Sequence, residues 1–166
     1  MTDDRRQMTD DSLRSPVPGL RSPISTQRPT RADVIAEARS WIGTPWRHQG
    51  RLKGIASDCV GLLIGAARAR GLLAPDFDVT GYSRFPEPEF FRANLERFLD
   101  RVEGGEKPAD VLWIRPRHIA QHVAILTDQN TIIHAIDIHR GVAEHIFDRA
   151  WRARVVSVYR FRGIDD

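Results

Sequence analysis

The chain contains a single cysteine among its 166 residues, together with only two methionines and two tyrosines. A lone cysteine cannot form an intramolecular disulfide, so noncovalent packing must hold the fold. No apolar run approaches the length of a membrane-spanning helix, and residues 1–6 lead into no apolar segment of a secretory signal. The sequence therefore predicts synthesis in the cytoplasm without a signal peptide, and no membrane insertion.

A strong excess of charge is also missing. Lys and Arg total 25 against 22 for Asp and Glu, which gives a formal net charge of +3. No basic cluster with interleaved aromatic side chains is present, so we expect no nucleic-acid partner. The 41% hydrophobic and 28% charged residues are ordinary for a globular domain, and the length suits one such domain.

The first 29 residues differ in composition from the rest. They carry four prolines among serines, arginines and aspartates, without apolar periodicity. This composition predicts a disordered leader over residues 1–29, followed by one domain over residues 30–166. Thr30 is a predicted helix N-cap, with Asp33 as its capping partner.

Helical periodicity predicts three helices, over residues 30–43, 58–71 and 87–99. The second is apolar nearly all round, as in a buried helix, and its Gly61 and Gly65 predict close approach of another backbone. Enrichment in β-branched residues predicts five strands, at 111–114, 121–126, 131–136, 142–147 and 155–161. Helices first and strands afterwards predict an α+β domain with a mostly antiparallel sheet.

Cys59 is the candidate nucleophile. It follows Asp58, a good N-cap, at the start of the second helix, and Gly61 leaves room beside the thiol. Free amides and the macrodipole at a helix start favour a thiolate. The alternative is an inert buried cysteine, since free cysteines are among the most buried residues. The sequence alone leaves both readings open.

Two histidines in predicted strands could complete a nucleophilic site. A hairpin turn centred on Asp128 would place His122 directly opposite His134, with Cβ atoms about 4.5–5.5 Å apart. A shift of the centre by half a residue would put them on opposite faces. In this arrangement His122 is the general base for Cys59, and His134 fixes the tautomer of His122.

A metal site competes for some of the same residues. His118 and His122 have the H-x-x-x-H spacing, and Asp137, His139 and His145 follow. That spacing presents two ligands on one face only in a helix, whereas this stretch is predicted as loop and strand. No second cysteine supports zinc, so we expect neither a metal nor a cofactor.

The chain resembles the NlpC family of papain-like cell-wall cysteine peptidases, and more closely its phage-type branch. The resemblance rests on residues 41–49 (Trp-Ile-Gly-Thr-Pro-Trp-Arg-His-Gln), 58–62 (Asp-Cys-Val-Gly-Leu), 110–113, 122–125 and 132–135. The chain departs from the usual pattern at Val60, where the family often has serine. It departs again at Arg47-His48-Gln49, where the family often has Trp-Gly-Gly.

The resemblance implies a papain-like fold in which the nucleophile helix packs on a five-stranded antiparallel sheet. It also implies a triad of Cys59, His122 and His134 that hydrolyses peptidoglycan stem peptides, at the D-glutamyl–diamino acid bond. By the same likeness Trp46 takes the place of a family tyrosine near the oxyanion site. Asp58 becomes a candidate to bind the substrate's amino group.

The phage-type branch shares the Arg-His-Gln motif, which implies delivery to the cell wall in a virion or gene-transfer particle and contacts with phage-like tail proteins. Two further functions stay open. One is a non-catalytic structural component of a tail tip that keeps the fold. The other is a related thiol acyl hydrolase.

Overall fold

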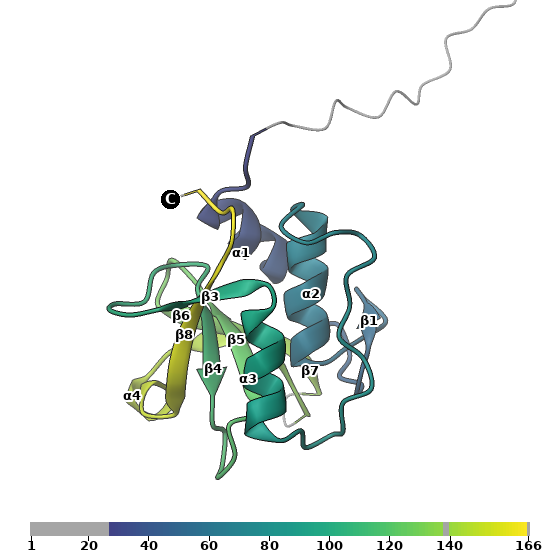
Figure 1. The fold of residues 1–166 in the computed structure, drawn as a ribbon, viewed down its shortest axis with the longest axis vertical. Helices are drawn as coiled ribbons and strands as arrows, with labels where there is room; N and C mark the ends of the chain where they lie inside the picture. The colour runs from purple at the N-terminus through teal and green to yellow at the C-terminus, as the bar shows by residue number, and fades with distance from the viewer. Residues whose placement is uncertain (1–26, 138–139, 166) are drawn as a thin grey trace, which may run out of the picture.

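A six-stranded antiparallel sheet forms the centre of the computed structural model, which describes residues 27–137 and 140–165 (Figure 1). The strand order is β3-β8-β4-β5-β6-β7. The strands are β3 (Leu99–Val102), β4 (Val111–Ile114), β5 (His122–Leu126), β6 (Thr131–Ile136), β7 (Gly141–Ile146) and β8 (Val155–Phe161). The predicted α+β class with an antiparallel sheet is confirmed. The expected number of five strands is wrong, because β3 adds a sixth at one edge.

The end of the third helix accounts for the extra strand. The predicted helix 87–99 is shorter in the structure, where α3 spans Pro88–Glu96. Leu99 already belongs to β3, pairs with Phe161 of β8 and is almost completely buried. Strand pairing and burial at a sheet edge thus override local helical periodicity, which carries no information on distant partners.

Three helices lie against one face of the sheet. α1 (Arg31–Arg39) begins with the predicted capping box, in which Thr30 and Asp33 bind each other's amides. It ends earlier than the predicted residue 43. α2 (Cys59–Ala69) follows the N-cap Asp58 and packs against β5 and β6. α1 and α2 also contact each other, so the nucleophile helix is held by both the sheet and a helix.

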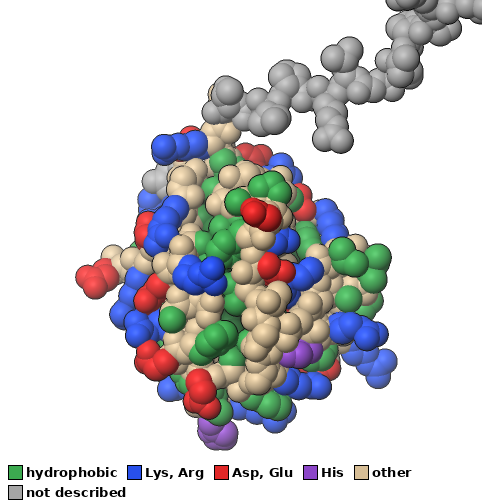
Figure 2. Space-filling model, turned by 45° about the vertical axis from the view of Figure 1, so that its right-hand side comes forward, with side chains coloured by type: hydrophobic (Ala, Val, Ile, Leu, Met, Phe, Trp, Pro, Cys, Tyr) green, Lys and Arg blue, Asp and Glu red, His purple; other side chains and the backbone are tan. Residues whose placement is uncertain are grey.

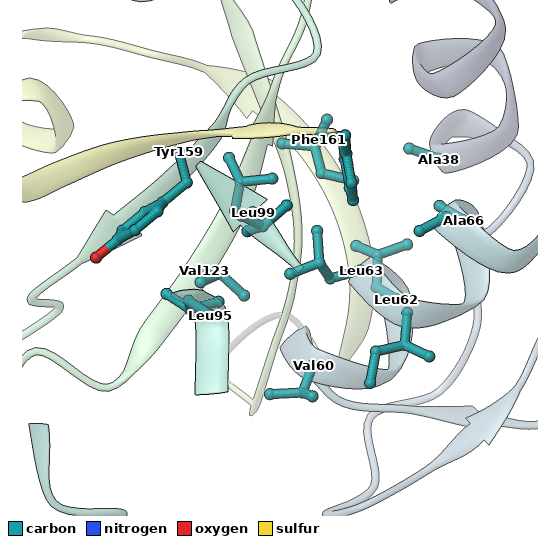
Figure 3. Packing of buried hydrophobic residues seen from close by; sticks show 14 of the residues in the cluster. Ala38, Val60, Leu62, Leu63, Ala66, Leu95, Leu99, Val123, Tyr159 and Phe161 are labelled. Atoms are coloured by element: carbon teal, nitrogen blue, oxygen red, sulfur yellow. The ribbon is translucent and has the colours of Figure 1, made fainter. Parts of the chain in front are cut away.

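Alternation along the strands sorts the core into two layers. Odd-numbered positions of β4, β5 and β6 join the helices in the larger cluster, part of which is drawn in Figure 3. Even-numbered positions form a smaller cluster on the opposite face, together with Trp151 of the short helix α4 (Arg149–Arg152). By this alternation the side chains of His122 and His134 belong to the second face.

The start of α2 touches a small two-stranded sheet formed by β1 (Arg51–Leu52) and β2 (Ala56–Ser57). A Cβ atom on Gly61 would lie 2.0 Å from the Gly50 carbonyl oxygen, which confirms the predicted close approach of a backbone. The same expectation is wrong for Gly65, whose neighbour is the ring of Trp41. Small residues on α2 thus admit a loop at one point and an indole at another.

The predicted leader falls largely on residues 1–26, outside the described residues. Among the described residues, the Asp165 amide donates a hydrogen bond to the Pro29 carbonyl, so the two ends of the described chain meet. Basic and acidic side chains are interspersed over the face seen in Figure 2. None of the helices in the described part of the chain is long and apolar enough to cross a membrane.

Candidate active site

Cys59 is the first residue of α2 and is half-buried. The Asp58 carboxylate accepts a hydrogen bond from the Gly61 amide at 2.8 Å, which caps the helix at this point. The amide of Val123, on β5, donates a hydrogen bond to the Cys59 sulfur. The helix start therefore holds the sulfur against β5, at the residue that follows His122.

The thiol and the nearest strand histidine are both uncharged near neutral pH. Burial, and then the negative charge of Asp58, raise the pKa of Cys59 to about 12, although nearby amides act in the opposite direction. Burial, and then repulsion from His145 once that ring is also protonated, lower the pKa of His122 to about 4. The expected preference for a thiolate at the helix start is wrong here, because desolvation outweighs the amides.

A chain of three imidazole rings, the histidine relay, extends from this point across the second face of the sheet. His122 Nε2 lies 2.9 Å from His134 Nδ1, and His134 Nε2 lies 2.8 Å from His145 Nε2. His145 Nδ1 lies 3.1 Å from the carbonyl oxygen of Ile146. His122 is 6% exposed and His134 is fully buried, so the first bond is shielded from water.

The predicted contact between His122 and His134 is present, but the predicted register is wrong. Ile125 pairs with Ile133, so the hairpin is centred one residue beyond Asp128. The two histidines are therefore diagonal neighbours and not direct partners. A shift of one whole residue keeps both side chains on the same face, and long side chains bridge such diagonals.

His145 occupies the equivalent diagonal position on β7. His134 pairs with Ala143, and His145 is the next residue on the same face. Trp151 of α4 covers both rings, with centroid distances of 5.2 Å to His134 and 5.1 Å to His145. The guanidinium of Arg154 lies over the indole at 5.1 Å. Trp151 thus packs against the outer part of the histidine relay, while the contact of His145 with Ile146 is exposed.

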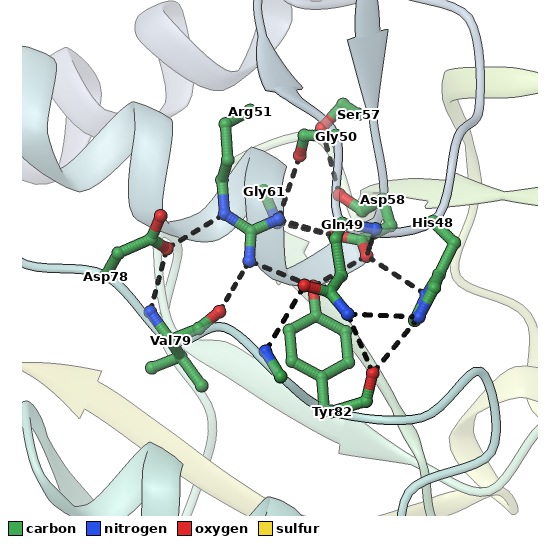
Figure 4. A network of polar contacts seen from close by, with 11 residues as sticks. His48, Gln49, Gly50, Arg51, Ser57, Asp58, Gly61, Asp78, Val79 and Tyr82 are labelled. Atoms are coloured by element: carbon green, nitrogen blue, oxygen red, sulfur yellow. Dashed lines mark hydrogen bonds and ion pairs between the residues drawn. The ribbon is translucent and has the colours of Figure 1, made fainter.

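Asp58 is the centre of a polar network drawn in Figure 4. Besides the Gly61 amide, its carboxylate accepts hydrogen bonds from the Gln49 amide at 2.7 Å, the Arg51 guanidinium at 3.2 Å and the Tyr82 hydroxyl at 2.7 Å. The side chain is only 6% exposed. Four protein donors therefore use the acceptor capacity of this carboxylate.

Arg51 connects that network to the segment between α2 and α3. Its guanidinium binds Asp78 at 2.9 Å, the Val79 carbonyl at 2.7 Å and the Tyr82 hydroxyl at 2.9 Å. Burial and the charge of Asp58 raise the pKa of Tyr82 far above its ordinary value, so its hydroxyl remains a donor. The network ties the helix start to residues 78–82.

A cavity of about 820 Å³ opens over the thiol, within the size range of substrate sites. Cys59, His122, Trp46 and Asp58 all line it, whereas His134 lies behind His122 and does not. Tyr82 and Phe85, from the connection between α2 and α3, line the cavity as well.

The cavity also has charged walls. Arg84 lies over the Trp46 ring at 4.7 Å and forms a 2.5 Å ion pair with Asp137, so it spans two parts of the rim. Arg117 and Arg154 line the cavity as well, and both are exposed. Three cationic side chains thus lie on the walls of the cavity.

Of the residues proposed for a metal site, His122 and His145 belong to the histidine relay. His118 lies in the exposed loop before β5, and His139 lies outside the described residues. Across residues 27–137 and 140–165, no group of three His, Cys, Asp or Glu side chains is placed to hold a metal ion.

Sequence reasoning did not find the roles of three important side chains. Arg51 and Tyr82 carry no local signal, because their partners lie 7 to 31 positions away in the chain. His145 could have been found, since an even-numbered turn between β6 and β7 puts it on the face of His134. The hairpin argument needed only to be extended by one strand.

Comparison with solved structures identifies the fold as that of NlpC/P60 domains. The NlpC/P60 domain of the peptidoglycan hydrolase SagA superposes with a TM-score of 0.55 at 21% identity, over 79% of this chain and 97% of that domain. The peptidoglycan hydrolase RipB from Mycobacterium tuberculosis superposes with a TM-score of 0.55 at 20% identity, over 82% of this chain and 65% of that protein.

An NlpC/P60 family protein from Bacillus cereus gives a TM-score of 0.59 at 17% identity, over 81% of this chain. The chain spans only 41% of that protein's length, and 42% of a similar protein from Staphylococcus aureus. No protein-family model and no curated sequence matches the chain. The likeness therefore establishes the shared fold, helices packed on an antiparallel sheet.

Proposed function

We propose that this chain is a cysteine peptidase of the NlpC type that hydrolyses amide bonds in peptidoglycan stem peptides. One observation carries the proposal: the lone thiol and the end of a buried histidine relay line the same cavity, in an NlpC/P60 fold. The solved relatives include peptidoglycan hydrolases by name, which supports the substrate class.

The reaction proceeds through an acyl-enzyme. Cys59 Sγ attacks the amide carbonyl carbon while its proton passes to His122 Nδ1, the ring nitrogen that is not bonded to His134. The C–N bond then breaks, and the proton moves from His122 to the departing amine. Water next attacks the thioester and gives a proton to His122. The C–S bond breaks, and the thiol recovers the proton.

The uncharged thiol–imidazole pair fits a mechanism in which proton transfer accompanies attack. With the pKa of Cys59 near 12 and that of His122 near 4, a preformed thiolate–imidazolium pair is scarce in the free protein. A bound substrate that excludes water and carries a polarised carbonyl makes the transfer productive. His134 acts as a positioning residue, because it reaches the thiol only through His122.

The remaining candidates act on the substrate. Trp46 lines the same cavity as Cys59, and its indole N–H would assist the amides at the start of α2 in stabilising the oxyanion. Asp58 also faces the cavity and is the candidate to receive the substrate's amino group. Its four protein contacts mean that such a group would share an oxygen with the existing donors.

Bond choice and delivery belong to the same proposal. We assign cleavage to the D-glutamyl–diamino acid bond on the overall resemblance to the NlpC family, and delivery to the cell wall by a phage or gene-transfer particle on the Arg-His-Gln motif at residues 47–49. In the fold, His48 and Gln49 both bind the Tyr82 carbonyl, at 3.1 and 2.9 Å. The motif thereby braces the connection over the cavity, and phage-like tail proteins would be its neighbours in a particle.

Digestion of defined muropeptides, with products identified by mass, tests the proposal. The unmodified protein should release a fragment that ends in D-glutamate, and Cys59→Ala should release none while its thermal unfolding is unchanged. His134→Ala should retain part of the rate. Thr80→Ala, an exposed change outside the cavity lining, is the matched control and should be fully active. Equal activity in Cys59→Ala would refute the peptidase.

A further inference from the structure

At His145 the histidine relay meets a backbone carbonyl, and that contact has a fixed polarity. A carbonyl oxygen only accepts hydrogen bonds, so the 3.1 Å contact with Ile146 requires a hydrogen on His145 Nδ1. A neutral imidazole carries one hydrogen. His145 Nε2 is then a lone-pair acceptor.

The remaining hydrogens follow from this first one. Because His145 Nε2 accepts, the 2.8 Å contact requires that His134 Nε2 donates. His134 Nδ1 is then an acceptor, and the 2.9 Å contact requires that His122 Nε2 donates. His122 Nδ1 is left without a hydrogen, which is the state of a general base.

We propose that His145 is a further positioning residue, which transmits the polarity of the Ile146 carbonyl through His134 and so keeps His122 Nδ1 unprotonated at the cavity that Cys59 also lines. This assignment rests on the proposed function only in naming His122 as the base. The tautomers themselves are a property of the free protein.

The opposite set of tautomers in the three imidazole rings is unfavourable because of the contact with Ile146. It would require a lone pair on His145 Nδ1 facing the lone pairs of the Ile146 oxygen, so that a hydrogen bond becomes a repulsion. His122 Nδ1 would then carry a hydrogen and could not accept the thiol proton. A single main-chain oxygen thus selects between a working and a non-working base.

Packing keeps the outer rings in place for this transmission. Trp151 contacts the rings of both His134 and His145, and the two imidazole centroids are 4.7 Å apart. A phenyl ring at position 145 would preserve the aromatic contacts but offer no acceptor to His134. A glutamine there would offer an amide oxygen near the place of Nε2.

The test is a two-bond ¹H–¹⁵N correlation spectrum of the full chain labelled with ¹⁵N-histidine, recorded without substrate at neutral pH. We expect His145 with hydrogen on Nδ1, and His134 and His122 with hydrogen on Nε2. His145 is the decisive signal, because the assignment predicts the Nδ1–H form there and the Nε2–H form at the other two. Hydrogen on His145 Nε2 alone would overturn the proposal.

Two variants separate positioning from packing. His145→Phe should leave thermal unfolding nearly unchanged, lower kcat about tenfold with little change in KM, and mix the His134 tautomers. His145→Gln should restore the His134 Nε2–H signal and most of kcat. Equal kcat in both variants, or a loss in both with unaltered tautomers, would overturn the assignment.

Failure of the proposed function is recognisable separately. If no muropeptide is cleaved but the three tautomers are as expected, the relay assignment stands and the peptidase proposal falls. If cleavage occurs with His122 carrying hydrogen on Nδ1, the peptidase proposal stands and the relay assignment falls.

Discussion

Asp58→Asn tests whether the start of α2 depends on a charged cap. Two donors bind each oxygen of the carboxylate: the Gly61 amide and Arg51 on Oδ1, and the Gln49 amide and Tyr82 on Oδ2. Asparagine replaces one oxygen by an NH₂ group. Whichever way the asparagine amide turns, its NH₂ group then faces two protein donors that have lost their acceptor.

The expected loss of stability is substantial. Leaving one buried donor unsatisfied costs about 1–3 kcal/mol, and breaking a buried ion pair by removing one partner costs about 3–5 kcal/mol. Arg51 keeps Asp78 as a partner, so we expect a decrease of about 3 kcal/mol in the unfolding free energy. Urea unfolding followed by tryptophan fluorescence measures it.

The matched control is Asp78→Asn. Asp78 Oδ1 accepts from Arg51 and from the Val79 amide, and an asparagine oxygen can accept from both. Its side chain is 28% exposed, so we expect a loss of about 0.5–1 kcal/mol. Equal losses in the two variants would refute the central position of Asp58 in the network.

The same substitution has a second, independent consequence. The charge of Asp58 raises the pKa of Cys59, so its removal should lower that pKa. The apparent pKa from alkylation rates at several pH values measures this shift, separately from any change in accessibility. A higher thiol pKa in Asp58→Asn would contradict the electrostatic argument.

Three further outcomes are expected. Alkylation of Cys59 should accelerate about tenfold per pH unit from pH 7 to 10, because its pKa is raised to about 12. The pKa of His122 is lowered to about 4, so the unfolded chain binds the extra proton. Stability should fall by about 3 kcal/mol as the pH drops from 6.5 to 4, and less in His122→Phe. Gly61→Ala should cost about 1–3 kcal/mol because its Cβ meets the Gly50 carbonyl, whereas Gly105→Ala, with open space, should not.

Each of these has a clear contrary result. Alkylation rates that level off below pH 9 would mean an ordinary thiol at position 59. Identical acid sensitivity in the native protein and His122→Phe would remove His122 as its source. If Gly61→Ala leaves the free energy of unfolding unchanged, the loop at Gly50 moves easily and the contact does not fix the helix start.

Local signals predicted much of the fold. The Thr30 capping box and the Asp58 N-cap depend on contacts within three residues, and both are present. Alternation located five strands to within one residue. The strand β3 could not be predicted, because its pairing with β8 joins residues about 60 positions apart and nothing local distinguishes its start from a helix end.

The candidate site was predictable in part for the same reason. The contact of His122 with His134 follows from side-chain parity, which survived an error of one residue in the turn. The electrostatic state of Cys59 did not follow, because it depends on burial by distant segments. The saturation of Asp58 likewise depends on Arg51 and Tyr82, which only the folded chain brings together.

The most direct test of the account is a rapid acid quench of the protein mixed with excess muropeptide, followed by intact and peptide mass analysis. We expect a transient adduct equal to the acyl part of the stem peptide on Cys59, and none in Cys59→Ala or His122→Ala. Product release that persists in Cys59→Ala, with no adduct on the thiol at any quench time, would contradict the account.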